Sequence, residues 1–350
     1  MQDAVTAEKI AAIATNISNR ALVRLLLAAS LAKVHRPEID IRKPYTEIGA
    51  HDAYSGRSYD EQYIANFVER HDLPCNPTTA FLTPALRNID TILSRDLEIV
   101  GRPRDLYKKA LEVLHEVYEG KVSAEDVLAE TIRDLLMFKA AKSEALSSLM
   151  QRLQGARDVP PLSSDGIVTL IDQHLKSPHA SRLPVLVVAA AYASAGEFLQ
   201  EKHLPLQSHN AADLQTGALG DVEITLTNED AVVTSYEMKM KRVTKLDIDY
   251  ALRKIERSSH QIDNYIFITT DVISDEVSDY ARSIYDQTGV EVVVLDCLSF
   301  LRHFLHLFHR LRMQFLDEYQ RLLVAEPESA VRQELKQVFL ALRLAAESGE

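Results

Sequence analysis

The chain has 350 residues, of which 46% are hydrophobic and 26% charged, and its formal net charge is -12. This composition is that of an ordinary globular protein, and the length allows two domains. No apolar run reaches the ~20 residues of a membrane span, and the first residues lack the basic and apolar regions of a signal peptide. Cys75 and Cys297 alone cannot build a disulfide framework or a Cys-rich zinc site. We therefore expect a cytoplasmic protein that does not enter a membrane.

The first part of the chain is predicted to be mostly helical, because its apolar residues recur at helical spacing. Ser123, with Asp126 three residues on, is a capping-box-like start for the last of these helices. The region 36–61 is polar and richer in Gly, Pro and Tyr, which indicates loops. The predicted helices are 7–35, 85–93, 104–119 and 123–154.

The second part has a different pattern, beginning after a segment rich in Pro, Gly and Ser at 155–166. Helices are predicted at 167–176, 184–202, 245–258, 274–287, from 298 onward, and in the tail 326–350, with strands in 220–242 and at 265–270 and 290–296. Antiparallel strands followed by alternating helix and strand predict a mixed α/β sheet, of the α+β kind, with helices on both faces. The predicted parts are a helical domain 1–155, a core 160–310 and C-terminal helices 311–350.

The segment "GDVEITLTNEDAVVTSYEMKMKR" (220–242) is predicted to be a β-hairpin with charged residues at its open end. Side chains alternate faces along a strand, so Glu237 and Lys239 share a face opposite to that of the apolar residues between them. With the turn centred on Glu229, residues whose numbers sum to 458 oppose each other, and Asp221 lies opposite Glu237. A turn shifted by one residue would put Glu223 there instead.

Two carboxylates opposed at ~5 Å repel each other unless a cation lies between them. Hard divalent ions such as Mg²⁺ take carboxylate, phosphate and water oxygens as ligands. Lys239 could stabilise charge on a phosphate or hold the attacking water. The simpler interpretation is an exposed hairpin face with mixed charge. The position of the hairpin, between a helix and a helix-strand-helix-strand series, favours a metal and phosphate site.

Asp221, followed by Glu237-Met238-Lys239, resembles the PD-(D/E)XK nuclease motif, with Gly220 in place of the proline. The resemblance implies a restriction-endonuclease-like core. It also implies that Asp221 and Glu237 bind Mg²⁺, that the Met238 carbonyl adds a ligand, and that Lys239 positions the water. Members of this superfamily often carry a further acid on the helix before the first strand.

For that further acid, Glu197 is the first candidate and Glu201 the second. An ordinary solvated position on a helix explains Glu197 equally well.

The segments 56–88 and 182–199 resemble the SacI family of type II restriction endonucleases. The resemblance implies sequence-specific cleavage of double-stranded DNA at a short palindrome by a homodimer, alongside a cognate DNA methyltransferase. The target of the family's namesake is GAGCTC.

Basic residues are concentrated from Lys239 to Arg257, where seven basic side chains face three acidic ones. Such residues would contact phosphates, which position a protein without reading sequence. Lys241, Arg242 and Lys245 are the candidates, although a solvated helix face is an equal alternative.

For base reading, the region 42–88 offers Arg, Lys and Asn side chains that suit base edges. These are Arg42, Lys43, Arg57, Asn76, Arg87 and Asn88, of which Arg57, Arg87 and Asn88 are the main candidates.

These observations predict a Mg²⁺-dependent type II restriction endonuclease. A nuclease with little sequence preference, serving repair, is an alternative within the same superfamily. A DNA-binding module with an inactive core is the alternative from another class.

Overall fold

The computed structural model of the chain describes residues 3–76, 78–155, 161–206, 218–258 and 262–348. The chain divides into two compact units, Met1–Glu144 (unit 1) and Ala145–Glu350 (unit 2). The division falls within the long helix α6 (Ala124–Gly155). The predicted linker 155–166 lies partly outside the described residues. The predicted division into a helical domain 1–155, a core 160–310 and C-terminal helices 311–350 stays a prediction.

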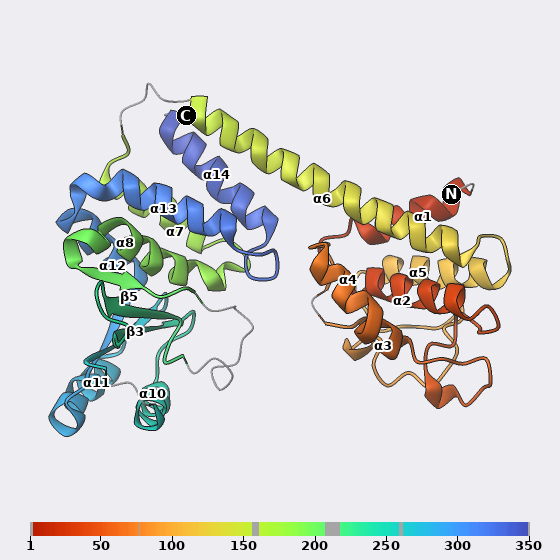
Figure 1. Ribbon diagram of the computed structural model, residues 1–350, viewed down its shortest axis with the longest axis horizontal. Coiled ribbons are helices and arrows are strands. Elements are labelled where there is room, and N and C mark those ends of the chain that lie inside the picture. The colour runs from red at the N-terminus through yellow and green to blue at the C-terminus, as the bar shows by residue number, and fades with distance from the viewer. Residues whose placement is uncertain (1–2, 77, 156–160, 207–217, 259–261, 349–350) are drawn as a thin grey trace. The chain divides into compact units, whose positions relative to one another are not determined.

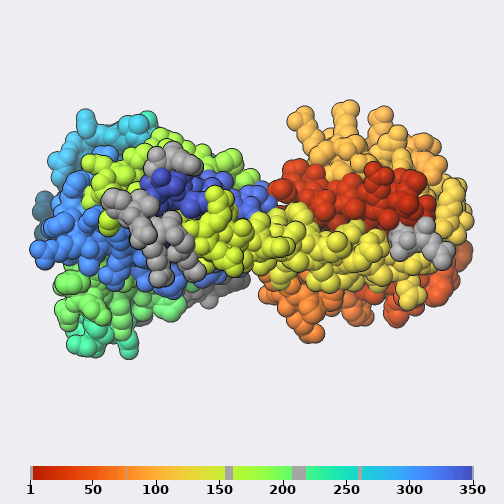
Figure 2. All heavy atoms as spheres, turned by 90° about the horizontal axis from the view of Figure 1, so that it is seen from above, coloured from red at the N-terminus to blue at the C-terminus, as the bar shows by residue number. Residues whose placement is uncertain are grey.

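Unit 1 is built from helices and long loops. Its elements are α1 (Ala4–Ala14), α2 (Ala21–His35), η1 (Thr46–Ile48), α3 (Gly56–Tyr59), η2 (Asp60–Ile64), α4 (Ala65–Arg70), η3 (Ala80–Leu82), α5 (Arg104–Tyr118) and the first part of α6. The first part of α6 lies beside α1 on one face of the unit (Figures 1 and 2). The capping residue predicted for α6 is confirmed, because the Asp126 N–H donates to Ser123 Oγ at 3.0 Å.

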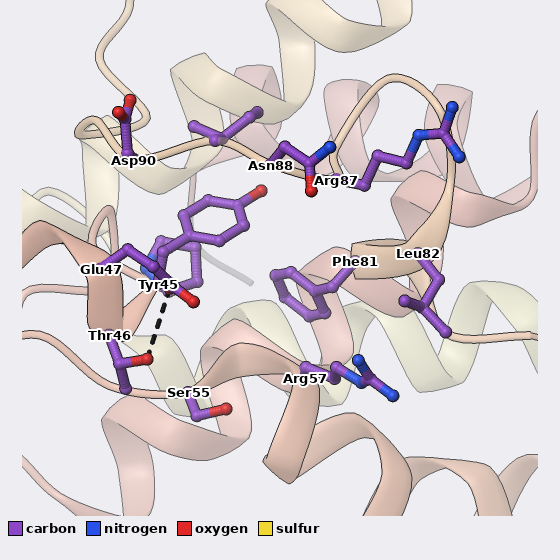
Figure 3. Close-up of a pocket in the computed structure, with 12 residues that line it drawn as sticks. Tyr45, Thr46, Glu47, Ser55, Arg57, Phe81, Leu82, Arg87, Asn88 and Asp90 are labelled. Atoms are coloured by element: carbon purple, nitrogen blue, oxygen red, sulfur yellow. Dashed lines mark hydrogen bonds between the residues drawn. The ribbon is translucent and has the colours of Figure 1, made fainter.

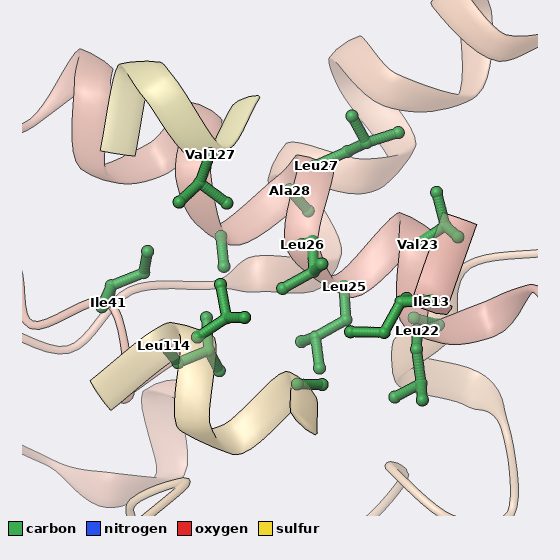
Figure 4. Packing of buried hydrophobic residues seen from close by; sticks show 14 of the residues in the cluster. Ile13, Leu22, Val23, Leu25, Leu26, Leu27, Ala28, Ile41, Leu114 and Val127 are labelled. Carbon is green, nitrogen blue, oxygen red and sulfur yellow. The ribbon is translucent and has the colours of Figure 1, made fainter. Parts of the chain in front are cut away.

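The central helix of unit 1 is α2, which is apolar on all sides and buried on all sides. Leu22, Leu25 and Leu26 are at most 1% exposed, and the close-up in Figure 4 shows them packed toward Leu114 of α5 and Val127 of α6. A helix without a polar face requires burial by neighbours all round. The surrounding helices of unit 1 provide it.

A buried ion pair joins α2 to η2 within this core. Arg24 of α2 is 2% exposed and Asp60 of η2 is fully buried. Arg24 Nε donates to both Asp60 carboxylate oxygens, at 3.0 and 3.2 Å, and its Nη1 donates to the Asn76 carbonyl at 2.7 Å. One guanidinium thus fixes two loop-rich segments on α2.

Two helix predictions in unit 1 are wrong. The single helix predicted at 7–35 is interrupted between α1 and α2, where Asn16 Oδ1 accepts from the Asn19 N–H at 2.8 Å. Asn and Asp side chains compete with the helix in this way. The helix predicted at 85–93 is a turn followed by a loop, and Asn88 in the left-handed conformation (φ +60°) ends the turn.

Unit 2 contains a five-stranded mixed sheet in the order β1-β2-β3-β4-β5. Its strands are β1 (Glu201–His203), β2 (Val222–Leu226), β3 (Val232–Lys239), β4 (Asn264–Thr269) and β5 (Glu291–Asp296). β1 and β3 each pair with β2 in the antiparallel direction, whereas β4 pairs with β3 and β5 in the parallel direction. The predicted α+β mixed sheet is confirmed, and β1, a short polar strand, was not predicted.

Helices cover both faces of this sheet (Figure 1). One face is covered by α8 (Leu183–Leu199) and α12 (Cys297–Leu307). On these two helices pack α7 (Ser164–Leu175) and α13 (Arg312–Ala325), and on those packs α14 (Gln333–Ser348); all three belong to the same core. The other face packs on α10 (Lys245–Arg257) and α11 (Asp275–Thr288). Alternation along β4 explains the two cores, because Ile266 and Ile268 enter the first and Tyr265 and Phe267 the second.

The helix predicted from residue 298 onward is divided into α12 and α13 by a short 3-10 turn, η5 (His309–Leu311). Arg312 stabilises this turn, because its Nη1 donates to the His309 carbonyl at 2.8 Å. The tail helix α14 was predicted.

The segment Ala180–Leu199 is long and apolar enough to span a membrane by length and composition, and 67% of it is buried inside the protein. It contains α8, which packs between the sheet and α13 as the core helix of unit 2.

His174, at the centre of the helical core of unit 2, is fully buried. Its Nε2 lies 3.0 Å from the Leu335 carbonyl, which can only accept, so Nε2 carries the proton. Its Nδ1, 2.9 Å from the Tyr319 hydroxyl, is then the acceptor. Burial lowers the pKa of His174 to about 4, against a smaller opposing effect of the Leu335 carbonyl.

This histidine predicts that unit 2 loses stability in mild acid. Because the pKa of His174 is lower in the folded chain than in the unfolded one, the unfolded chain binds more protons between about pH 4 and 6.5, and stability falls as the pH falls through that range. The loss is about 3 kcal/mol at most. Urea unfolding at several pH values measures it, with His174→Gln as the non-titrating control. An equal pH dependence in both proteins would contradict the prediction.

Candidate functional site

The register of the β2–β3 hairpin decides which charges meet. Val222 pairs with Tyr236 and Glu223 with Ser235, as predicted for a turn centred on Glu229. A β-bulge between Ile224 and Thr225 shifts the register nearer the turn. The open end keeps the predicted pairing as far as Val222 and Tyr236; Asp221 directly precedes Val222, and Glu237 directly follows Tyr236.

Asp221 is fixed to β3 by two hydrogen bonds. Its backbone N–H donates to the Tyr236 carbonyl at 2.7 Å, and its Oδ2 accepts from the Met238 N–H at 2.8 Å. Glu223 has a different orientation, because its Oε1 accepts from the Leu219 N–H at 2.8 Å. Asp221 is therefore the acid of β2 that the structure brings to the Glu237-Met238-Lys239 segment.

Gly220 allows this close approach of the two strands. A Cβ atom at Gly220 would lie 2.4 Å from Ser235 Oγ and 2.5 Å from the Tyr236 carbonyl oxygen. The second contact is with backbone, which cannot rotate away as a side chain can. The glycine that stands before Asp221 is thus required by the packing of β2 on β3.

Glu237 is surrounded by donors. Lys239 Nζ lies 3.0 Å from Oε1, and Lys254 Nζ lies 3.5 Å from Oε2. The Tyr265 hydroxyl donates to Oε2 at 3.2 Å. Tyr265 and Lys254 also lie 2.9 and 3.0 Å from the Leu219 carbonyl oxygen, which ties this carboxylate to the segment before β2.

Lys239 lies among three carboxylates. Besides Glu237, its Nζ is 3.7 Å from Asp247 Oδ1 at the start of α10. Burial, the largest single influence, lowers the pKa of Lys239, but the carboxylates of Glu237, Asp247 and Asp221 together raise it above its ordinary value. Lys239 is therefore an ammonium ion throughout the neutral pH range.

Asp247 has a second role as part of the capping box of α10. The Thr244 N–H and hydroxyl both donate to its Oδ2, at 2.9 and 2.6 Å, and the Asp247 N–H donates back to Thr244 Oγ1. These bonds and Lys239 lower the pKa of Asp247, although its partial burial raises it. The same residue thus starts α10 and faces Lys239.

The sequence analysis missed Asp247, Lys254 and Tyr265 as members of this cluster. Asp247 and Lys254 are seven residues apart, so they lie on one face of α10, the face that buries Ile248 and Ala251. This spacing of opposite charges beside buried residues was a usable signal. Tyr265 is the partner of Ser235 across the parallel β3–β4 pair, a contact that no local pattern indicates.

Glu197 and Glu201 lie near the turn end of the hairpin, away from Asp221. Glu201 pairs with Leu226, the last residue of β2, and a Cβ at Gly196 would lie 2.5 Å from the Glu201 carbonyl oxygen. Asp221 is five residues away along β2, about 17 Å. The structure therefore does not bring the predicted fourth acid to the pair.

The cations predicted to contact phosphates, Lys241, Arg242 and Lys245, are exposed. The backbone that carries the first two is anchored on the end of β4. Thr269 Oγ1 donates to the Lys241 carbonyl at 3.1 Å, and the Arg242 N–H donates to Asp271 at 3.1 Å. Lys245 pairs with Glu276 of α11 at 2.8 Å.

Among the residues predicted to read bases, Arg57, Arg87 and Asn88 line one pocket of unit 1 (Figure 3). Arg42 and Lys43 do not join them, because they bind the carboxylates of Asp40 and Asp52. The three main candidates are therefore brought together, although the chain separates Arg57 from the other two.

For a metal, the cluster offers the carboxylate oxygens of Asp221 and Glu237, whereas the third carboxylate, Asp247, binds Thr244 and faces Lys239. Such a donor set suits Mg²⁺, which prefers hard oxygen ligands and keeps several waters. Within the described residues, no group of three or more His, Cys, Asp and Glu side chains is placed to hold a metal ion. A cation here would therefore depend on two acids, backbone, water and a bound phosphate.

The mixed sheet, with acids and a charged lysine at the open end of one hairpin, has the groups that hydrolysis of a phosphodiester requires. Residues 162–270, from α7 to β4, match the family model of the SacI restriction endonuclease C-terminal domain. The chain is a restriction endonuclease, a nuclease that acts on DNA. The match is to this one domain of the SacI family and covers 109 of the 350 residues. A search of curated proteins gave no match.

The close approach at Gly220 gives a prediction for Gly220→Ala. The added methyl group must push β2 away from the Tyr236 carbonyl, which weakens both hydrogen bonds of Asp221, and we expect a loss of about 1–3 kcal/mol in stability. Urea unfolding and hydrogen exchange of the Met238 amide measure the effect.

Gly166→Ala is the matched control, since a Cβ there has its nearest contact at 3.2 Å, with the Ser163 hydroxyl. Equal stability of the two variants, with unchanged Met238 exchange, would show that Gly220 does not hold the strands together.

Proposed function

We propose that this protein is a Mg²⁺-dependent type II restriction endonuclease. It cleaves double-stranded DNA at a short palindrome, in the cytoplasm and as a homodimer, and its host carries a cognate DNA methyltransferase. The products have 5′-phosphate and 3′-hydroxyl ends, and GAGCTC is the first target to test. The observation that carries the proposal is the Asp221 carboxylate bound to the Met238 N–H, beside Glu237 and Lys239.

The metal ligands in this proposal are Asp221, Glu237 and the Met238 carbonyl. When bound, Mg²⁺ polarises the phosphate and lowers the pKa of water. The hydrogen bond from the Met238 N–H holds the Asp221 carboxylate in one orientation. Tyr265 and Lys254 do the same for Glu237. Both acids are thus preorganised, as a catalytic constellation requires.

Lys239 acts as a hydrogen-bond donor in the proposed reaction. Because its pKa is raised, the Nζ atom carries a full set of protons at neutral pH and cannot accept one from water. Lys239 instead donates a hydrogen bond to a lone pair of the attacking water and so orients it. It also stabilises the negative charge that develops on the phosphate. A separate group, or the phosphate and solvent, must take the proton.

Lys241, Arg242 and Lys245 follow Lys239 along the chain and would contact the DNA backbone. They place cations immediately beside the candidate site, so phosphates bound there would position the scissile bond without reading sequence. The exposure of their side chains supports this role.

Cleavage by single-residue variants tests the proposed site. Asp221→Asn and Lys239→Met each remove one charge, and we expect single-turnover cleavage of plasmid DNA in Mg²⁺ to fall by about 100-fold or more. Glu223→Gln and Glu197→Gln are the matched controls, because these acids point elsewhere, and they should cleave as the wild type does. Wild-type rates in Asp221→Asn and Lys239→Met would exclude this site.

The same digests separate the alternatives to this function. Discrete fragments with mapped, identical ends support a restriction endonuclease, whereas a smear supports the less specific repair nuclease of the same superfamily. DNA binding without cleavage by the wild type or any variant supports an inactive DNA-binding module.

Because the Lys254 ammonium group lies 3.5 Å from Glu237 Oε2, we predict that Lys254 opposes metal binding at this carboxylate. Lys254 Nζ neutralises the carboxylate that Mg²⁺ needs, so Lys254→Met should raise the Mg²⁺ affinity of the DNA-free protein several-fold. Calorimetric titration measures this change without any activity readout. In this variant the Tyr265 hydroxyl can still donate to the Leu219 carbonyl, so that carbonyl does not lose both of its side-chain donors.

Arg253→Met is the control, because Arg253 lies over the Tyr250 ring on the exposed side of α10. An unchanged or lower Mg²⁺ affinity in Lys254→Met would show that the Lys254 ammonium group and Mg²⁺ do not compete for Glu237.

A further inference from the structure

Unit 1 contains a pocket of about 410 Å³ between the loop at residues 44–47, the start of α3, η3 and the turn that follows it. Its charges are separated along its length. Figure 3 shows the Arg57 and Arg87 guanidinium groups at one end, on either side of Leu82, and Glu47 and Asp90 at the opposite end. The Asn88 side chain lies between these ends.

Aromatic rings form the middle of the pocket. The Phe81 ring packs edge-on against the Tyr45 ring, with centroids 5.8 Å apart. The Tyr45 hydroxyl donates to the Leu86 carbonyl at 2.8 Å, and a Cβ at Gly56 would lie 2.4 Å from the Phe81 ring. Contacts on both sides therefore hold the Phe81 ring in place, and the 5% of its surface that stays exposed forms part of the pocket wall.

The polar groups fit a planar ligand that carries both hydrogen-bond donors and acceptors. Two arginines and two acids give the lining no net charge, so a bare anion at the acidic end would be repelled. A nucleobase matches this set, since carboxylates accept from exocyclic amino groups and an Asn amide bonds adenine edges. A phosphate attached to that base would meet Arg87 and the terminal nitrogens of Arg57, whose Nε binds Glu61 at 2.7 Å.

The concave form of the pocket excludes paired bases. An element that reads duplex DNA protrudes into a groove, whereas a pocket lined by an aromatic ring can receive a base only after that base has left the stack. We propose that this pocket binds one unstacked nucleotide of the DNA substrate, with the base against Phe81 and its phosphate between Arg57 and Arg87. This inference rests on DNA being the substrate of the proposed function.

The test compares binding of two short duplexes of the same sequence by the full chain, one fully paired and one with a single extrahelical 2-aminopurine. EDTA in the buffer prevents cleavage. We expect the wild type to bind the bulged duplex about tenfold more tightly, and the 2-aminopurine fluorescence to change as the base enters the pocket.

Two variants locate the effect. Asn88→Gly removes the amide and suits the left-handed backbone there, and Arg87→Gln removes an exposed charge. Both should lose most of the preference for the bulged duplex. Arg70→Gln, an exposed arginine on α4 outside the pocket lining, removes the same charge and should keep the preference.

Equal binding of the two duplexes by the wild type would overturn the proposal, as would a preference that both pocket variants retain. Binding of free dAMP as tightly as the bulged duplex would also overturn it, since the site would then serve free nucleotides.

Cleavage of paired plasmid DNA in Mg²⁺, measured in parallel, keeps the two proposals separate. Cleavage without a bulge preference rejects the pocket alone, and a bulge preference without cleavage rejects the nuclease alone.

Discussion

Two carboxylates at the open end of one hairpin are the constraint on which the candidate site depends. Like charges on opposed strand positions repel, so each must be held by other groups. Backbone holds Asp221, through the Met238 N–H at 2.8 Å. Side chains hold Glu237, through Lys239 at 3.0 Å, Tyr265 at 3.2 Å and Lys254 at 3.5 Å. Each of the two acids therefore has binding partners of its own within the protein.

The charges of this cluster nearly cancel. Asp221, Glu237 and Asp247 face Lys239 and Lys254, which leaves one negative charge in excess. A divalent cation would reverse the sign of the site, and an anionic phosphate would then be attracted where the apo site repels it. This order, cation before phosphate, follows from the arrangement of the residues alone. If Glu237 turned to a metal, Lys254 would keep the Leu219 carbonyl as a partner.

The sequence could predict the parts of this structure that depend on local periodicity. The alternation of apolar and polar residues predicted the hairpin. With the turn placed at Glu229, it also predicted the strand pairing at the open end, but it did not predict the bulge at Ile224. The fold class followed from the order of helices and strands. The break at Asn16 was missed because a side-chain hydrogen bond there overrides apolar spacing. The turn at Asn88 was missed because this residue takes the left-handed backbone conformation.

The remainder of the site could not be predicted, because it depends on how elements pack. Lys254 reaches Glu237 only because α10 covers the face of the sheet that carries it. Glu197 was a reasonable candidate by position in the chain, but α8 leads into β1 at the end of the hairpin that lies away from Asp221. Another part of α8 lies closer to the candidate site, because its Tyr192 hydroxyl is 2.9 Å from the hydroxyl of Tyr236, the residue before Glu237. That part of α8 contains no acidic residue.

The net charge of -12 is compatible with DNA as substrate because of how the cations are distributed. Arg24, Arg42, Lys43, Arg182 and Arg343 all pair with acids of their own unit. The exposed cations beside the candidate site are few, so the number of phosphates they can neutralise is small. Affinity that comes from phosphates alone scales with that number and weakens steeply with salt. For an acidic protein with so few phosphate contacts, tight binding requires contacts to bases, and the polar pocket of unit 1 is where three of the candidate base-reading residues meet.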